Sequence, residues 1–87
     1  MYIILYTHSP QPKFVQPVTE YHDLDLTSFV SKALKFNTEE EAKEFCIADG
    51  EAIRKNNKPY DGYDVYLRDG RFKIVLEDEY IIKEIIE

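Results

Sequence analysis

The segment from Tyr63 to Leu76 constrains the fold of this chain more than any other part of the sequence. It places Asp69-Gly70 between two stretches in which apolar and polar residues largely alternate. An Asp-Gly pair is typical of a two-residue β-hairpin turn, because a type I′ turn requires positive φ at both central positions. The sequence therefore predicts a hairpin with its turn at Asp69-Gly70.

The same pattern predicts the register of the hairpin. With Asp69-Gly70 as the loop, one face of the two strands is wholly apolar and the other is mostly polar, and a slip by one residue would destroy this separation. We expect the apolar face to pack on a core. The pairs on that face are Leu67 with Phe72, Val65 with Ile74 and Tyr63 with Leu76.

The first residues of the chain predict a central strand. Tyr2–Thr7 is rich in β-branched and aromatic residues and is apolar on both faces. It has no preceding basic segment and no small-residue cleavage pattern after it, so we interpret it as a strand and not a signal peptide. Three prolines in Ser9–Pro17 predict an irregular or edge-like connection, in which Phe14-Val15 pairs at most briefly at an edge.

The clearest helix is predicted over Thr38–Lys55. Thr38 and Glu41 match a capping box, and three glutamates at the start suit the positive end of the helix dipole. Asn56 to Pro59 ends the helix. The expected buried stripe consists of Ala42, Phe45, Cys46, Ala52 and Ile53.

Asp49 interrupts this stripe, and Gly50 follows it. A buried carboxylate without a partner is costly, and a glycine inside a helix costs about 1 kcal/mol relative to alanine. Three interpretations stay open. The helix ends near Ala48 and restarts with Asp49 as its cap, the sheet is too short to cover Asp49, or Asp49 contacts something functional.

Two further segments are ambiguous. Apolar residues from Leu26 to Leu34 follow a helical spacing, but a strand through Ser28–Val30 followed by one helical turn fits nearly as well. Glu77-Asp78-Glu79 precedes the isoleucine-rich segment Tyr80–Glu87, for which we favour a short C-terminal helix over a strand.

Length, charge and cysteine content limit the classes of protein to which this chain can belong. A chain of 87 residues predicts one domain over 1–87, and its formal net charge of −6 disfavours direct nucleic-acid binding. No apolar run is long enough for a membrane span. The single cysteine, Cys46, excludes an internal disulfide and a thiolate zinc cluster, so we expect a cytoplasmic protein with an inert core thiol.

Residue patterns that carry chemistry are scarce, and we expect no catalytic residues, no metal, no cofactor and no enzyme activity. There is no glycine-rich phosphate loop, and His8 and His22 are the only imidazoles. A metal site at His22, Asp23 and Asp25 is conceivable, but a solvated loop is the simpler interpretation. Cys46 on a buried helix face argues against a nucleophile–base pair.

The chain contains seven tyrosines among its 87 residues, which is an unusual feature of its composition. Tyrosine offers a large, stiff, amphipathic surface that is favoured in binding hot spots. The alternative is that the tyrosines cover sheet edges and line the rim of the core. Those on or beside predicted strands are Tyr2, Tyr6, Tyr60, Tyr63 and Tyr66.

The run from Ala33 to Phe45, with its A-x-x-F-x-T-x-E-E-A spacing, resembles a pattern common in small phage and prophage proteins. Those chains often open with a strand like Tyr2–Thr7 and close with a hairpin. The resemblance implies a phage-encoded accessory protein that binds and inhibits a host enzyme or defence complex. It assigns no functional residue to this chain.

The sequence predicts an α+β fold with a three- to four-stranded, mostly antiparallel sheet and one main helix packed on one face. The function we favour is a non-enzymatic inhibitor or modulator that binds a host protein. The alternatives are a module that sequesters a small molecule or nucleotide, and a structural domain that pairs its strand edges in a homodimer. The candidate binding residues are Glu39, Glu40, Asp49, Tyr60, Asp61, Tyr66, Glu77, Asp78 and Glu79.

Overall fold

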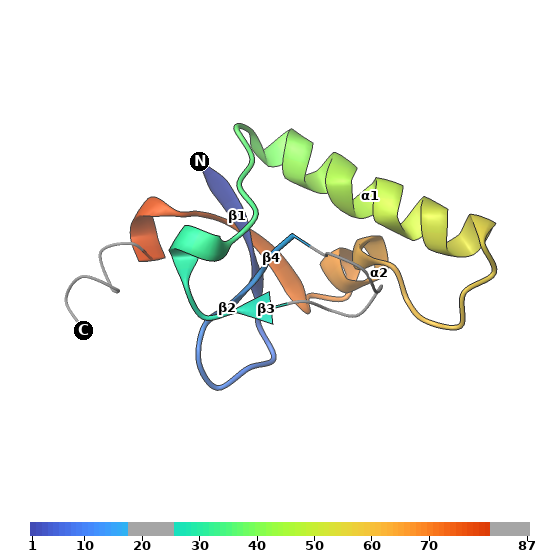
Figure 1. Cartoon of the computed structure of the whole chain (residues 1–87), viewed down its shortest axis with the longest axis horizontal. Coiled ribbons are helices and arrows are strands. Elements are labelled where there is room, and N and C mark those ends of the chain that lie inside the picture. Colours follow the sequence, from blue (N-terminus) through green and yellow to red (C-terminus); the bar gives the residue numbers. More distant parts are fainter. Residues whose placement is uncertain (18–25, 81–87) are drawn as a thin grey trace.

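The computed structural model of the chain describes residues 1–17 and 26–80. It confirms the predicted α+β fold, because a four-stranded antiparallel sheet carries one long helix, α1, on one face (Figure 1). The strands lie in the order β3-β2-β1-β4. The elements are β1 (Tyr2–Tyr6), β2 (Lys13–Val15), β3 (Leu26–Thr27), a 3-10 helix (Val30–Lys32), α1 (Glu39–Lys55), α2 (Tyr63–Arg68) and β4 (Phe72–Leu76).

The predicted central strand is confirmed, since β1 lies between β2 and β4. The expectation for Phe14-Val15 was wrong in one respect. These residues belong to β2, which pairs with both β1 and β3 and is therefore not an edge. Both side chains are fully buried, so packing holds this short strand inside the sheet although prolines flank it.

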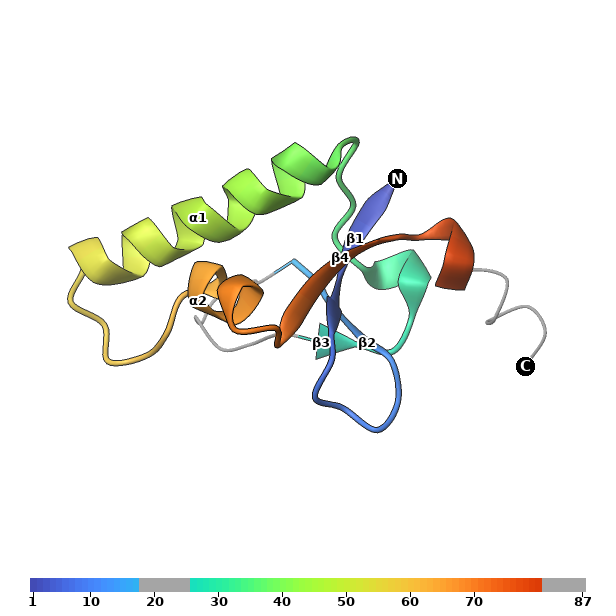
Figure 2. The same cartoon turned by 180° about the vertical axis from the view of Figure 1, so that it is seen from behind.

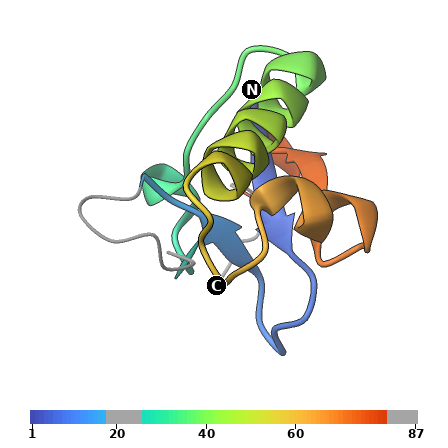
Figure 3. The same cartoon turned by 90° about the vertical axis from the view of Figure 1, so that its right-hand side faces the viewer.

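Each face of the sheet has its own core. On one face, Ile4 and Phe72 pack with residues of α1 and α2, and Figure 3 shows these two helices side by side over the sheet. On the other face, Ile3 and Phe14 pack against Val30 of the 3-10 helix, which is seen from behind in Figure 2. The two faces explain why β1 is apolar on both sides.

Helix α1 begins as predicted. The Thr38 hydroxyl accepts a hydrogen bond from the backbone amide of Glu41 at 3.1 Å. The Glu41 carboxylate accepts from the amide of Asn37 at 3.2 Å, one residue earlier than in a standard capping box. The predicted stripe was wrong at Ala52, which is exposed, because the buried position on this part of the helix is Gly50, beneath α2.

The predicted hairpin is wrong. Residues Tyr63–Arg68 form α2, and β4 pairs with β1, so that Ile4 lies opposite Ile74 and Tyr2 opposite Leu76. Tyr63, Tyr66 and Leu67 have the spacing i, i+3 and i+4, and as a helix they turn one apolar face to the core. The same residues alternate well enough to resemble a strand.

The Asp-Gly signal marks the end of this helix and not a hairpin turn. Gly70 has φ of 88°, but Asp69 is in the right-handed helical region with φ of −87°. The amide of Asp69 donates to the carbonyl of Val65 at 2.9 Å, and Gly70 supplies the left-handed residue that commonly follows a helix. A type I′ turn would need positive φ at both positions.

Neither interpretation of the segment from Leu26 to Leu34 was fully right. A strand precedes a helical turn, as in the second alternative, but the strand covers Leu26–Thr27 and the turn is the 3-10 helix. Residues 78–80 are helical, while most of the predicted C-terminal helix lies outside the described residues. No helix in the described ranges is both long and apolar enough to cross a membrane.

Candidate functional site

The structure distributes the predicted binding residues over three places. The first is the acidic end, which we define as Glu39, Glu40, Glu77, Asp78 and Glu79. The second is Asp49, in the contact between α1 and α2. The third is the Arg71 cluster, consisting of Asp61, Tyr66, Asp69 and Arg71, and the last candidate, Tyr60, directly precedes Asp61 in the chain.

The acidic end forms around the first residues of β1. Tyr2 and Phe36 exchange backbone hydrogen bonds of 2.8 and 2.9 Å on one side, which brings the start of α1 close. On the other side, the amide of Glu77 donates to the carbonyl of Met1 at 2.9 Å. Two acidic segments that are far apart in the sequence therefore flank the same strand end.

Most carboxylates of the acidic end are exposed. Glu39, Glu40, Asp78 and Glu79 are all exposed, and the Lys43 ammonium lies 3.8 Å from the Glu40 carboxylate. Two apolar side chains are exposed beside these carboxylates, Met1 at 50% and Leu76 at 41%. The surface thus combines negative charge with accessible apolar area, and both features occur in protein interfaces.

Glu77 differs from the other carboxylates because it has a structural partner. The Lys35 ammonium donates to its carboxylate at 2.7 Å and to the carbonyl of Val30 at 2.8 Å. The hydrogen bond from Lys35 is the main cause that lowers the pKa of Glu77 below its ordinary value. Lys35 thus ties the 3-10 helix to the end of β4.

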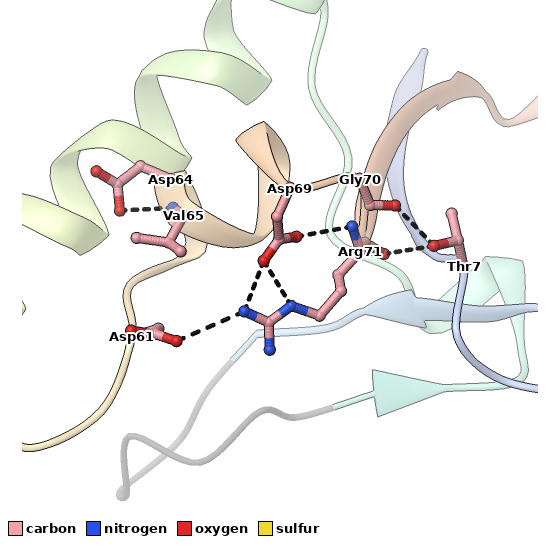
Figure 4. A network of polar contacts seen from close by, with 7 residues as sticks. All are labelled: Thr7, Asp61, Asp64, Val65, Asp69, Gly70 and Arg71. Carbon is pink, nitrogen blue, oxygen red and sulfur yellow. Dashed lines mark hydrogen bonds and ion pairs between the residues drawn. The ribbon is translucent and has the colours of Figure 1, made fainter.

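The Arg71 cluster lies at the opposite end of α1 from Glu39 and Glu40. The Arg71 guanidinium contacts the Asp69 carboxylate at 2.7 Å and that of Asp61 at 3.5 Å, as Figure 4 shows. It also lies over the Tyr66 ring, 3.7 Å from the centroid. Since α1 has 17 residues, about 25 Å of helix separates its start from the loop that carries Asp61.

Hydrogen bonds hold the Arg71 cluster in a defined arrangement. The side chain of Asp69 accepts from both the side chain and the amide of Arg71, and these bonds lower the pKa of Asp69. Thr7 completes the arrangement, because its hydroxyl donates to the carbonyl of Gly70 at 2.7 Å (Figure 4). The cluster therefore joins α2 to the start of β4 and to the end of β1.

Asp49 has a structural role in the contact between the two helices. Helix α1 is continuous through Asp49, so the interpretation that it ends near Ala48 was wrong. The Asp49 carboxylate, which is half-buried, accepts a hydrogen bond of 2.9 Å from the amide of Tyr63, the first residue of α2. A carboxylate from one helix thus caps the start of another.

Gly50 and Gly62 allow the backbones of the two helices to approach closely. A Cβ atom on Gly50 would lie 2.0 Å from the Asp64 carboxylate, and one on Gly62 would lie 2.4 Å from the Cα of Gly50. Asp64 is 7% exposed and contacts Arg54 at 3.0 Å. Burial raises the pKa of Asp64, but bonds from Arg54 and the Val65 amide, with the charges of Arg54 and Arg68, lower it overall.

Cys46 lies in the core beneath these helices with no exposed surface. Burial, followed by the negative charges of Asp49 and Asp64, raises the pKa of its thiol to about 12. Such a thiol is a poor nucleophile at neutral pH. Within the described ranges, no three His, Cys, Asp or Glu side chains gather as metal ligands, and the conceivable site at His22, Asp23 and Asp25 lies outside them.

The tyrosines do not form one common surface. Tyr63 is buried and packs edge to face on Phe72, with ring centroids 5.3 Å apart. Tyr66 is half-buried between Phe72 and Arg71. Tyr60, 40% exposed, is the most accessible of those predicted to bind and lies beside Asp61.

No known protein family matches the chain, and no curated protein or solved structure matches it significantly.

Several organising residues were not predicted from the sequence. Arg71, Asp64 and Lys35 each join two or more elements, but their partners lie far away along the chain or depend on α2 being helical. One sequence signal was available, because a glycine in the middle of α1 and a second one at Gly62 are typical of a close helix contact.

Proposed function

We propose that this chain is a non-enzymatic protein-binding modulator that docks through its acidic end onto a basic surface of another protein. The observation that carries the proposal is the clustering of exposed Glu39, Glu40, Asp78 and Glu79 around half-exposed Met1 and Leu76. These side chains come from α1 and from the segment after β4, so folding is needed to assemble them.

Electrostatics supports a basic partner. Among the described residues of this end, the cations that oppose the carboxylates are Lys35, Lys43 and the N-terminal ammonium of Met1. Lys35 and the ammonium are both engaged with Glu77, which leaves Lys43 beside the exposed Glu40. An extended negative patch speeds association with a positive patch and rejects negative partners.

The partner we favour is a nucleic-acid enzyme or a defence complex of a host cell. Proteins that bind nucleic acid neutralise phosphates with lysine and arginine, and an acidic protein surface would compete for the same side chains. The likeness of the run from Ala33 to Phe45 to phage accessory proteins is consistent with this choice. We therefore place the protein in the cytoplasm of the host.

The experiment is a pull-down from nuclease-treated bacterial lysate, read by mass spectrometry, followed by affinity measurements at increasing salt. We expect a stoichiometric partner with a basic surface that elutes with salt. Glu40→Lys should weaken its binding by about tenfold, as one close charge pair changes sign. A partner whose affinity is independent of salt would contradict the proposal.

The matched control is Glu51→Lys. Glu51 is exposed on the same helix, so the net charge changes by the same amount, but it lies three helical turns from Glu40. Asp78→Lys tests the other acidic segment in the same way. If Glu40→Lys and Glu51→Lys weaken binding equally, the acidic end is not the binding surface.

A further inference from the structure

Strand β4 forms an edge of the sheet. In the order β3-β2-β1-β4, its only neighbour among the described residues is β1. It has the five residues Phe72–Leu76 in regular extended form, without proline. An edge of this kind presents unpaired backbone groups to which another strand can be added.

The hydrogen bonds to β1 identify which backbone groups point outward. At one end of the ladder, the amide of Thr7 donates to the carbonyl of Arg71, and at the other, the amide of Glu77 donates to the carbonyl of Met1. Because bonded positions alternate along an antiparallel strand, Lys73 and Val75 also face β1. The amides and carbonyls of Phe72, Ile74 and Leu76 therefore point away from the sheet.

The charges along this edge change sign from one end to the other. Arg68, Arg71 and Lys73 lie at or before the start of β4, and Glu77, Asp78 and Glu79 follow its end. A second copy aligned antiparallel would bring the basic start of each strand to the acidic end of the other. A parallel copy would oppose like charges.

We propose that β4 pairs antiparallel with β4 of a second copy, about a two-fold axis at Ile74, to form a continuous eight-stranded sheet. This register opposes Ile74 to Ile74 of the other copy and Phe72 to Leu76, so every outward amide and carbonyl gains a partner. It also opposes Arg71 to Glu77, with Lys73 on the adjacent diagonal.

The half-exposed side chain of Leu76 fits this arrangement. Leu76 shares a sheet face with Ile74 and Phe72, and it is 41% exposed in the single chain. In the dimer it lies beside Phe72 of the second copy and loses contact with water. Leu76 and Glu77 belong both to this pairing and to the acidic end, whereas Glu39 and Glu40 of α1 lie outside the pairing. The test of the pairing uses the chain alone, so its outcome is separate from that of the proposed function.

The test is sedimentation velocity of the whole chain over a wide range of concentration. We expect a reversible species with a mass near twice the 10.3 kDa of one chain, which dissociates as salt rises. Leu76→Pro removes an outward amide but none that bonds to β1, so it should raise the dissociation constant by about tenfold or more. Leu76→Ala, which keeps the amide, should raise it much less.

A second variant tests the charge pairing without altering the backbone. Lys73→Glu changes an exposed side chain and should also weaken the dimer, while Lys58→Glu makes the same change of net charge in the loop after α1 and should not. A chain that stays monomeric at every concentration would overturn the proposal. So would a dimer that Leu76→Pro and Lys73→Glu leave intact, or one that Lys58→Glu weakens as much as Lys73→Glu does.

Discussion

Asp49, in the middle of α1, accepts a hydrogen bond from the backbone amide of Tyr63 at the start of α2, with 2.9 Å between the oxygen and the nitrogen. Gly62, the residue before Tyr63, has no side chain with which to cap its own helix. The cap comes instead from the neighbouring helix. A carboxylate that breaks the apolar stripe of α1 is thereby used to start α2.

Asp49→Ala should destabilise the chain by about 1 kcal/mol, as loss of a helix cap typically does. Asp49→Asn keeps an oxygen that can accept from the Tyr63 amide and should cost less. Urea unfolding followed by circular dichroism measures both. Equal stability of Asp49→Ala and the unmodified chain would show that the bond to Tyr63 contributes nothing.

Gly50→Ala should destabilise the chain by about 1–3 kcal/mol, although alanine is the better helix former. The added Cβ would lie 2.0 Å from the Asp64 carboxylate, so α2 or Asp64 must move. Thermal unfolding gives the sign of the change. A stabilised Gly50→Ala variant would contradict the close contact between the helices.

Asp64→Ala provides the matched background for Gly50→Ala. When the carboxylate is absent, the added methyl group meets less obstruction, so Gly50→Ala should cost less in this background than alone. A double-mutant cycle measures the difference, since residues in contact are not additive. Additive effects would mean that Asp64 does not face Gly50.

Gly70→Ala should cost about 1 kcal/mol through backbone strain alone. Gly70 has φ of 88°, and an added Cβ would have no heavy atom within 4 Å. Gly70→Asn should cost less, because asparagine tolerates positive φ better than alanine. The urea midpoint should be highest for the unmodified chain, lower for Gly70→Asn and lowest for Gly70→Ala. Equal midpoints would contradict a strained backbone at this position.

The stability of the chain should fall in acid partly through Glu77. Its pKa lies below the ordinary value of 4.5, chiefly because Lys35 donates a hydrogen bond to the carboxylate. A lowered folded-state pKa stabilises the chain above pH 4.5, and the stabilisation is lost as pH falls through the folded value. Glu77→Gln should be less stable at pH 7 by about 0.5–1 kcal/mol and less sensitive to acid below pH 5.

Urea midpoints measured between neutral pH and about pH 3 test the role of Glu77. The control is Glu79→Gln, because Glu79 is exposed whereas Glu77 is half-buried beside Lys35. Asp64 and Asp69 also have lowered pKa values, so Glu77→Gln should reduce the acid sensitivity and not abolish it. An unchanged pH profile in Glu77→Gln would contradict the link to Lys35.

The features predicted correctly from the sequence depend on neighbouring residues. Thr38 and Glu41 fix the start of α1 within a few residues, and the apolar run in β1 needs only burial on both faces. The segment from Tyr63 to Arg68 satisfies two periodicities, and Gly70 serves equally in a turn and after a helix. Whether Tyr63–Arg68 forms a helix or a strand depends on contacts with Asp49 and Gly50, which are distant in the sequence. The local pattern alone therefore favoured a hairpin, which is wrong.

In the candidate sites, too, the exposure of single residues could be predicted from the local sequence, but their assembly in space could not. That Glu39, Glu40, Asp78 and Glu79 lie in exposed positions could be expected from their place in charged runs. Their assembly around Met1 required the pairing of β1 with β4, and the Arg71 cluster required α2 to be a helix. Neither arrangement has a signature in a short stretch of sequence.

The measurement that tests the proposed function most directly is the amount of partner captured from nuclease-treated lysate by the unmodified chain, by Glu40→Lys and by Glu51→Lys, at low and high salt. We expect one basic partner that the unmodified chain and Glu51→Lys capture equally at low salt. Glu40→Lys should capture much less of it, and high salt should release it. A partner captured equally by all three chains, and retained at high salt, would contradict the proposed function.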